Sequence, residues 1–140
     1  MSAPIAGYPD GTRVPVLKLG NILLVTLQGD LHDAAAERLQ RDIGEAIAAS
    51  SVDGVVIDIS GVEIVDSFLG RVFAEVAAHS KLLAAQTVVA GMRPAVAITL
   101  VELGLTMPGL RTALDTEEAM RLLGPAPAHL RQDPERRERP

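Results

Sequence analysis

A run of β-branched residues interrupted only by Asp58, VVIDI (Val55–Ile59), constrains the fold of this chain more than any other segment. A strand with one face in water alternates apolar and polar residues, whereas a strand covered on both faces is apolar throughout. Gly54 precedes the run, and the turn residues Ser60–Gly61 follow it. The run therefore predicts a central strand of a sheet that is covered on both faces.

The segments after this strand predict a βαβ unit. Apolar residues recur at helical spacing through Asp66–Leu83, and Gln86–Gly91 is a second short buried strand. A further helix is expected to begin at Pro94, because the fixed φ and missing N–H of proline suit a first helical turn. Gly104 is a good terminator for that helix.

The segments before the central strand predict a hairpin and a helix. Val14–Leu19 and Asn21–Leu27 are strand-like and are joined by the turn pair Gly20–Asn21. A helix is expected to follow, with Asp33 accepting hydrogen bonds from the free N–H groups at its start. Its apolar stripe consists of Leu39, Ile43, Ala46 and Ile47.

The C-terminal part predicts one more strand and helix. Arg111–Leu114 is a plausible short strand, and the capping box from Asp115 to Glu118 precedes a last helix through Leu123. The full order, β-β-α-β-α-β-α-β-α, implies an α/β fold. We expect a mixed, mostly parallel sheet of about five strands with about four helices.

Composition limits the class of protein. The 140 residues suffice for one domain, which we place at 14–124, with a flexible segment at 1–13 and a disordered tail at 125–140. The net charge of −5 and an aromatic content of 2% argue against nucleic acid as a partner. The absence of cysteine excludes zinc ribbons, thiol nucleophiles and disulfides. No signal peptide or membrane span is recognisable, so we expect a cytoplasmic protein.

Ser67 is the residue whose position most suggests function. It lies at the expected start of a helix, beside free backbone N–H groups and the positive end of the helix dipole. A phosphate at such a position is favoured by roughly 0.3–1 kcal/mol. The structural alternative is that the Asp66–Ser67 pair only caps the helix.

Three stretches of the chain resemble a known family. VVIDIS, VDSFLG (Val65–Gly70) and AGMRPAVAITLVELGL (Ala90–Leu105) are similar to the STAS domains of anti-sigma-factor antagonists, and most similar to the stressosome branch typified by RsbS. The resemblance covers roughly residues 14–123. Sporulation-type members carry a small residue after the phosphoacceptor, whereas Phe68 and Leu69 follow it here, which favours the RsbS branch.

The resemblance implies a regulatory role without enzymatic activity or cofactor. Ser67 matches the serine that an RsbT-type switch kinase phosphorylates, and Asp66, Phe68 and Gly70 are expected to take part in partner binding. The unmodified protein would assemble with RsbR-type paralogues and hold the kinase, and phosphorylation would release it. An RsbX-type phosphatase would reset the state.

Two residues of these motifs keep alternative interpretations. Phe68 is either an exposed contact for a partner or a hydrophobic staple against the core. Thr99 matches a region where RsbR-type paralogues carry a second phosphoacceptor, but a hydroxyl within a helix more often bonds back to its own backbone. The helix around it, Ala95–Leu103, is apolar on most sides, which implies either deep burial or a contact with another subunit.

The sequence gives little support for metal binding or nucleophilic catalysis. His32, His79 and His129 lack the spacing of a metal site, and none is placed to serve as a general base for Ser67. Two alternatives to the phosphorylation-controlled module remain. One is a STAS domain that binds a nucleotide, anion or lipid between the turn at 58–70 and the helix from Pro94, with Arg71 and Arg93 as the available cations. The other is a purely structural shell subunit.

Overall fold

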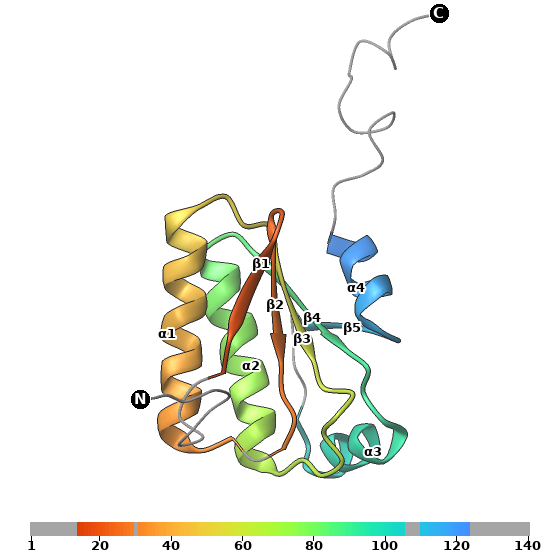
Figure 1. The fold of residues 1–140 in the computed structure, drawn as a ribbon. Coiled ribbons are helices and arrows are strands. Elements are labelled where there is room, and N and C mark those ends of the chain that lie inside the picture. Colours follow the sequence, from red (N-terminus) through yellow and green to blue (C-terminus); the bar gives the residue numbers. More distant parts are fainter. Residues whose placement is uncertain (1–13, 30, 106–109, 124–140) are drawn as a thin grey trace, which may run out of the picture.

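The computed structural model describes residues 14–29, 31–105 and 110–123 (Figure 1). The predicted terminal segments at 1–13 and 125–140 lie outside this range. The described residues form one five-stranded sheet and four helices. The strands are β1 (Val16–Leu19), β2 (Ile22–Thr26), β3 (Gly54–Asp58), β4 (Gln86–Ala90) and β5 (Leu110–Ala113). The helices are α1 (Asp33–Ala49), α2 (Ser67–Leu82), α3 (Pro94–Glu102) and α4 (Thr116–Leu123).

The sheet has the strand order β1-β2-β3-β4-β5. β1 runs antiparallel to β2, as the predicted hairpin requires, and the other neighbours are parallel. β3 is the central strand, and Val55, Val56 and Ile57 are almost completely buried, which confirms the expectation from its apolar sequence. The α/β class with a mixed, mostly parallel sheet is therefore confirmed.

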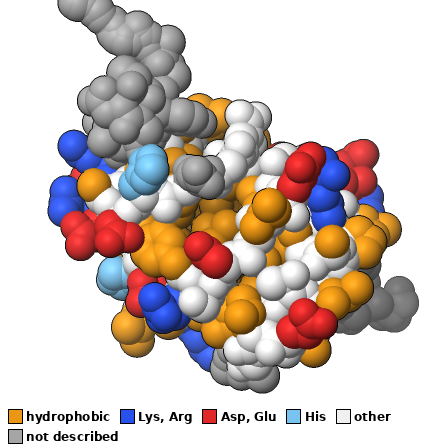
Figure 2. All heavy atoms as spheres, turned by 90° about the horizontal axis from the view of Figure 1, so that it is seen from below, with side chains coloured by type: hydrophobic (Ala, Val, Ile, Leu, Met, Phe, Trp, Pro, Cys, Tyr) orange, Lys and Arg blue, Asp and Glu red, His pale blue; other side chains and the backbone are white. Residues whose placement is uncertain are grey.

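The helices cover the two faces of the sheet unequally. α1 and α2 lie side by side on one face, α4 lies on the other, and α3 lies at the end where the parallel strands finish (Figure 1). The main core joins α1, α2 and α3 to one face of the sheet, and a smaller cluster around Val56 and Val88 lies under α4. Figure 2 shows the molecule from the end that carries α3.

The helix ends test the expectations drawn from the local sequence. α3 begins at Pro94, and Gly104 beyond its end has a φ of +71°. The capping box of α4 is formed: Asp115 Oδ1 accepts from Glu118 N at 2.8 Å, and Glu118 Oε1 accepts from Leu114 N at 2.7 Å. The expected cap at Asp33 is wrong, because His32 occupies the N-cap position of α1 without a side-chain hydrogen bond. Asp33 is the first helical residue, where a carboxylate still interacts favourably with the helix dipole.

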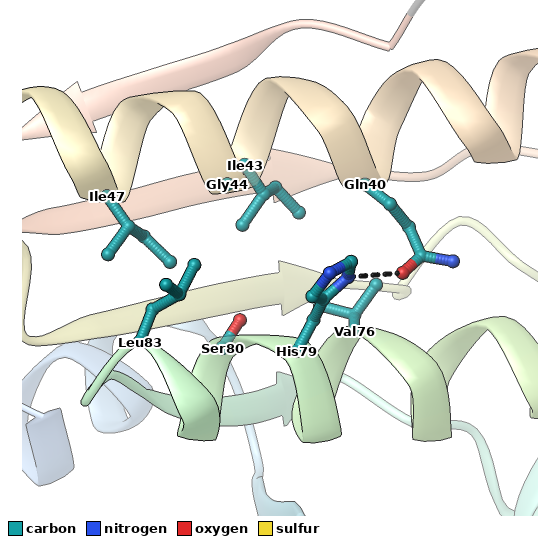
Figure 3. A pocket seen from close by; sticks show the side chains of 8 residues that line it. All are labelled: Gln40, Ile43, Gly44, Ile47, Val76, His79, Ser80 and Leu83. Carbon is teal, nitrogen blue, oxygen red and sulfur yellow. Dashed lines mark hydrogen bonds between the residues drawn. The ribbon is translucent and has the colours of Figure 1, made fainter.

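The second half of α2 packs against α1. In Figure 3, Ile43 and Ile47 of α1 and Leu83, directly after α2, point into the seam between the two helices. The exposed side chain of His79 bonds Gln40 Oε1 at 3.1 Å across this seam. Gln40 also donates to Glu75 Oε1 at 2.9 Å, so polar bonds close the outer edge of an apolar contact.

Candidate functional site around Ser67

The connection from β3 to α2 is held by two buried valines. Val62 and Val65 are 1% and 5% exposed, respectively, whereas Ile64 between them is almost fully exposed. Asp58 Oδ1 accepts from Ser60 N at 2.9 Å, which closes the turn that follows the strand. The loop is therefore fixed from within and presents its remaining side chains to solvent.

Asp66, and not Ser67, caps α2. The Oδ1 atom of Asp66 accepts from Leu69 N at 2.9 Å, and the Asp66 carbonyl accepts from Gly70 N at 3.0 Å. Ser67 is the first residue of the helix and is exposed. Its hydroxyl forms no hydrogen bond with any residue in the described part of the chain. Of the Asp66–Ser67 pair, Asp66 alone therefore caps the helix, and the Ser67 hydroxyl takes no part in the cap.

The loop after β4 contacts the turn that leads to Ser67. Gly91, directly after β4, has a φ of +77°, and a Cβ built on it would lie 2.9 Å from Ser60 Cβ and 3.2 Å from Ser60 N. Arg93 Nε donates to the Ser60 carbonyl at 3.1 Å. Sequence reasoning did not identify Ser60, and its only signal was a glycine at the end of the neighbouring strand. The two loops that follow β3 and β4 thus form one unit.

Phe68 combines both interpretations that the sequence left open. Its side chain is partly buried and packs against the main core, as a staple would. It also borders a hollow of about 290 Å³ beside the start of α2. The lining residues of this hollow are Gly29, Leu31, His32, Ile64, Asp66, Phe68 and Leu69. A partner side chain that enters the hollow would touch Phe68 within reach of Asp66.

Gly70 is buried and has a packing role. A Cβ at this position would overlap the side chain of Leu105 and lie 3.2 Å from Leu100 Cδ2. The absence of a side chain lets α2 approach the end of α3 closely. Any effect of Gly70 on a partner is therefore exerted through the position of these helices.

The outer face of α3 is apolar and open. Val96 and Leu100 are buried, but Ile98 is 58% exposed and Val101 is 78% exposed, so deep burial within this chain is excluded as the reason for the apolar sequence. Thr99 Oγ1 donates to the Ala95 carbonyl at 3.0 Å, which is the backbone bond that we expected. At this end of the molecule, hydrophobic side chains lie between single charged ones (Figure 2).

The described residues hold no cluster of three or more potential metal ligands. His32 and Asp66 line the same hollow, and neither is hydrogen-bonded to the Ser67 side chain. This hollow is bordered by the β2–α1 connection, and neither Pro94 nor any lysine or arginine is among the described residues that line it. No helix in the described part of the chain is long and apolar enough to cross a membrane.

Comparison with known proteins places this geometry in context. The family model of the STAS domain matches residues 13–119. The RsbT co-antagonist protein RsbRD of Bacillus subtilis is 30% identical over 120 residues, which are 86% of this chain and 40% of that protein. This chain thus spans about two fifths of the length of the curated relatives that it matches.

Two solved structures are similar over most of their length. A serine-to-glutamate variant of RsbS from Moorella thermoacetica is 35% identical, with a TM-score of 0.69 over 79% of this chain and 93% of that one. A structure described as the molecular architecture of the stressosome, a signal integration and transduction hub, is 38% identical. Its TM-score is also 0.69, and the match covers 78% of this chain and 95% of that one.

Proposed function

This chain belongs to the STAS domain family, near its stressosome members RsbS and RsbR, and from this premise we propose that it is a phosphorylation-controlled scaffold for stress signalling. In this proposal it binds an RsbT-type switch kinase while Ser67 is unmodified and releases the kinase when Ser67 is phosphorylated. The observation that carries the proposal is the exposed, unbonded hydroxyl of Ser67 at the first position of α2.

The charges around Ser67 explain how a phosphate would act. A phosphoserine adds about −1.5 to −2 charges at pH 7. The exposed Asp66 directly precedes Ser67, the exposed Glu63 lies in the loop before α2, and Asp58 lies at the end of the preceding strand. The helix dipole offsets only roughly 0.3–1 kcal/mol of this accumulation. An apolar or acidic partner surface would therefore lose affinity, while the fold, whose cap is Asp66, would remain intact.

The hollow beside α2 supplies the shape for a specific contact. Ile64 projects into solvent at its rim, and Phe68 forms part of its wall. We assign Phe68 and Asp66 to direct contact with the kinase, and Gly70 to the positioning of α2 against α3. An apolar anchor in a hollow next to the phosphorylated group would make binding sensitive to that group.

The remaining partners follow from the similarity to stressosome proteins. The open face of α3 suits a contact with RsbR-type paralogues in a cytoplasmic complex, and an RsbX-type phosphatase would remove the phosphate. Phosphorylation of Thr99 is less favoured, because its hydroxyl is already bonded to the Ala95 carbonyl. The role is non-enzymatic and needs no cofactor.

The first prediction tests this switch directly. The full chain is incubated with ATP and an RsbT-type kinase, and the modified residue is located by mass spectrometry. We expect phosphate on Ser67. We also expect Ser67→Asp to weaken kinase capture at least about tenfold, a change of about 1.4 kcal/mol, with the thermal transition retained.

The control is Ser51→Asp, which adds the same charge to an exposed serine in the α1–β3 connection, at the opposite end of the parallel strands. It should leave capture unchanged. Phosphate on another residue with Ser67 unmodified would contradict the proposal. If Ser67→Ala assembled and released the kinase normally, the chain would be a constitutive shell subunit.

A further inference from the structure

Arg71 is an exposed cation one helical turn after Ser67. α2 is a continuous helix from Ser67 to Leu82, so Ser67 and Arg71 stand four positions apart on one helix. Residues with this spacing lie on the same helix face, with their Cβ atoms about 5–6 Å apart. Both side chains are exposed, so the guanidinium of Arg71 can reach a group attached to the Ser67 hydroxyl.

The guanidinium of Arg71 has no partner of its own. In the part of the chain that the structure describes, it forms no hydrogen bond and no ion pair. Glu75, the only acid on α2, follows Arg71 by four positions, but its Oε1 accepts from Gln40 at 2.9 Å. A cation that precedes an acid on a helix is also the less favourable order of such a pair. Arg71 is therefore available to another anion.

The other cations of the described chain are less suited to a phosphate on Ser67. Arg93 contacts the turn before α2, but its Nε already donates to the Ser60 carbonyl at 3.1 Å. Lys81 lies fourteen residues after Ser67 on α2, which is about 21 Å along the helix axis. Arg71 is thus the arginine that combines proximity to Ser67 with a free side chain.

The chemistry of a phosphoserine complements this position. A guanidinium presents a planar fork of donors that matches two phosphate oxygens, and such charge-assisted bonds are stronger than neutral ones. An anion that precedes a cation by four positions is the favourable order on a helix. The unmodified serine carries no charge, so the pair would exist only in the phosphorylated chain.

We propose that Arg71 is the counter-ion of phosphorylated Ser67, and that its guanidinium binds the phosphate oxygens across one turn of α2. This inference rests on the proposed function, which places the phosphate on Ser67. Arg71 is a positioning residue, because it holds the phosphate against the helix and does not react. The surroundings of Ser67 remain acidic, because the pair leaves Asp66 and Glu63 without a counter-ion, so a partner is still repelled.

The pair has a measurable consequence for the charge of the phosphate. The second pKa of a phosphoserine is ordinarily about 6. The exposed carboxylates of Asp66 and Glu63, and Asp58 at the end of β3, would raise this pKa, because like charges disfavour the second negative charge. Arg71, and His32 when protonated, would lower it. Arg71 therefore favours the doubly charged phosphate near neutral pH.

The test places phosphoserine at position 67 of the full chain by genetic encoding, so that no kinase is needed. Phosphorus NMR during a pH titration gives the second pKa of the phosphate. Arg71→Gln should raise this pKa by at least about 0.3, and Arg71→Lys, which keeps the charge, should raise it less. Lys81→Gln is the control, since it removes the same charge from the same helix at more than two Debye lengths. It should leave the pKa unchanged.

Several results would overturn the assignment of Arg71. One is an unchanged phosphate pKa in Arg71→Gln, and another is an equal rise in Lys81→Gln, which would mean a general effect of net charge. A rise in Arg93→Gln and not in Arg71→Gln would show that the loop after β4 holds the phosphate instead. The proposed function is tested separately with the same protein. A phosphoserine chain that captures the kinase as tightly as the unmodified chain would contradict the switch, whatever the phosphate pKa.

Discussion

At the scale of single residues, the cap of α2 and the proposed phosphorylation fall on two neighbouring residues, Asp66 and Ser67. A helix start needs an acceptor for its free N–H groups, and Asp66 supplies it through the bond from Leu69 N. Ser67 is thereby released from a structural role, and its hydroxyl can be modified without loss of the cap. A phosphate on a capping serine would instead disturb the start of the helix.

This division predicts different costs for substitutions at the two positions. Asp66→Ala should lower the free energy of unfolding by about 1 kcal/mol, because the cap is lost. Asp66→Asn should be nearly neutral, because the amide oxygen can accept the same bond. Ser67→Ala should also be nearly neutral. Urea unfolding of the three variants measures these differences, and a loss for Ser67→Ala as large as that for Asp66→Ala would show that the serine is the cap.

At the scale of elements, the site depends on the close contact of two loops. The loop after β4 passes so near Ser60 that only a glycine fits at position 91, and Arg93 bonds the Ser60 carbonyl from the same loop. The turn before α2 is therefore supported from a strand and a helix that lie later in the chain. Any change in this contact should reach Ser67 through the connection at 60–66.

A comparison of Gly91 with Gly104 separates the energetic cost of the close contact with Ser60 from the cost of a left-handed backbone. Gly91 and Gly104 have φ values of +77° and +71°, but only Gly91 has a neighbour within 4 Å of a built Cβ. Gly104→Ala should cost about 1 kcal/mol of stability for the left-handed backbone alone. Gly91→Ala should cost about 3 kcal/mol, because it adds an overlap with Ser60. Denaturant unfolding of both variants measures the difference, and equal losses would mean that the loops can move apart at little cost.

The sequence predicted the elements well because their signals are local. Apolar spacing, Pro94, Gly104 and the capping box each act within a few residues, so the order of all strands and helices could be derived without a structure. The cap of α1 was misassigned, because either His32 or Asp33 could stand at the N-cap of that helix.

Contacts between distant residues were not predictable in this way. Ser60 and Arg93 are 33 positions apart, and the hollow at Phe68 joins residues 29–32 to residues 64–69. Nothing in local spacing specifies such distances. Ser67 itself was identified from its place at a helix start and from the family resemblance, whereas its freedom from hydrogen bonds could be seen only in the structure.

At the scale of the whole molecule, apolar surface is concentrated in two separate places. Leu17 and Leu19 are exposed on the outer side of the β1–β2 hairpin, and Ile98 and Val101 are exposed on α3, which lies at the end of the parallel strands (Figure 1). A twofold contact by itself closes at a dimer, so a larger assembly needs a second, different contact. Two separate apolar surfaces would satisfy this requirement.

Val101→Glu tests the proposed contact between α3 and an RsbR-type paralogue. Val101 is 78% exposed on α3, so the substitution should not disturb folding, but it would place a charge in the centre of a contact between subunits. In light scattering of the chain mixed with an RsbR-type paralogue, we expect the large complex to disappear. Phosphorylation of Ser67 should persist, because Ser67 does not lie on α3. Leu114→Glu, at an exposed leucine after β5, serves as the control and should assemble normally. A full-sized complex with Val101→Glu would show that the paralogue binds elsewhere, and the apolar side of α3 would then need another explanation.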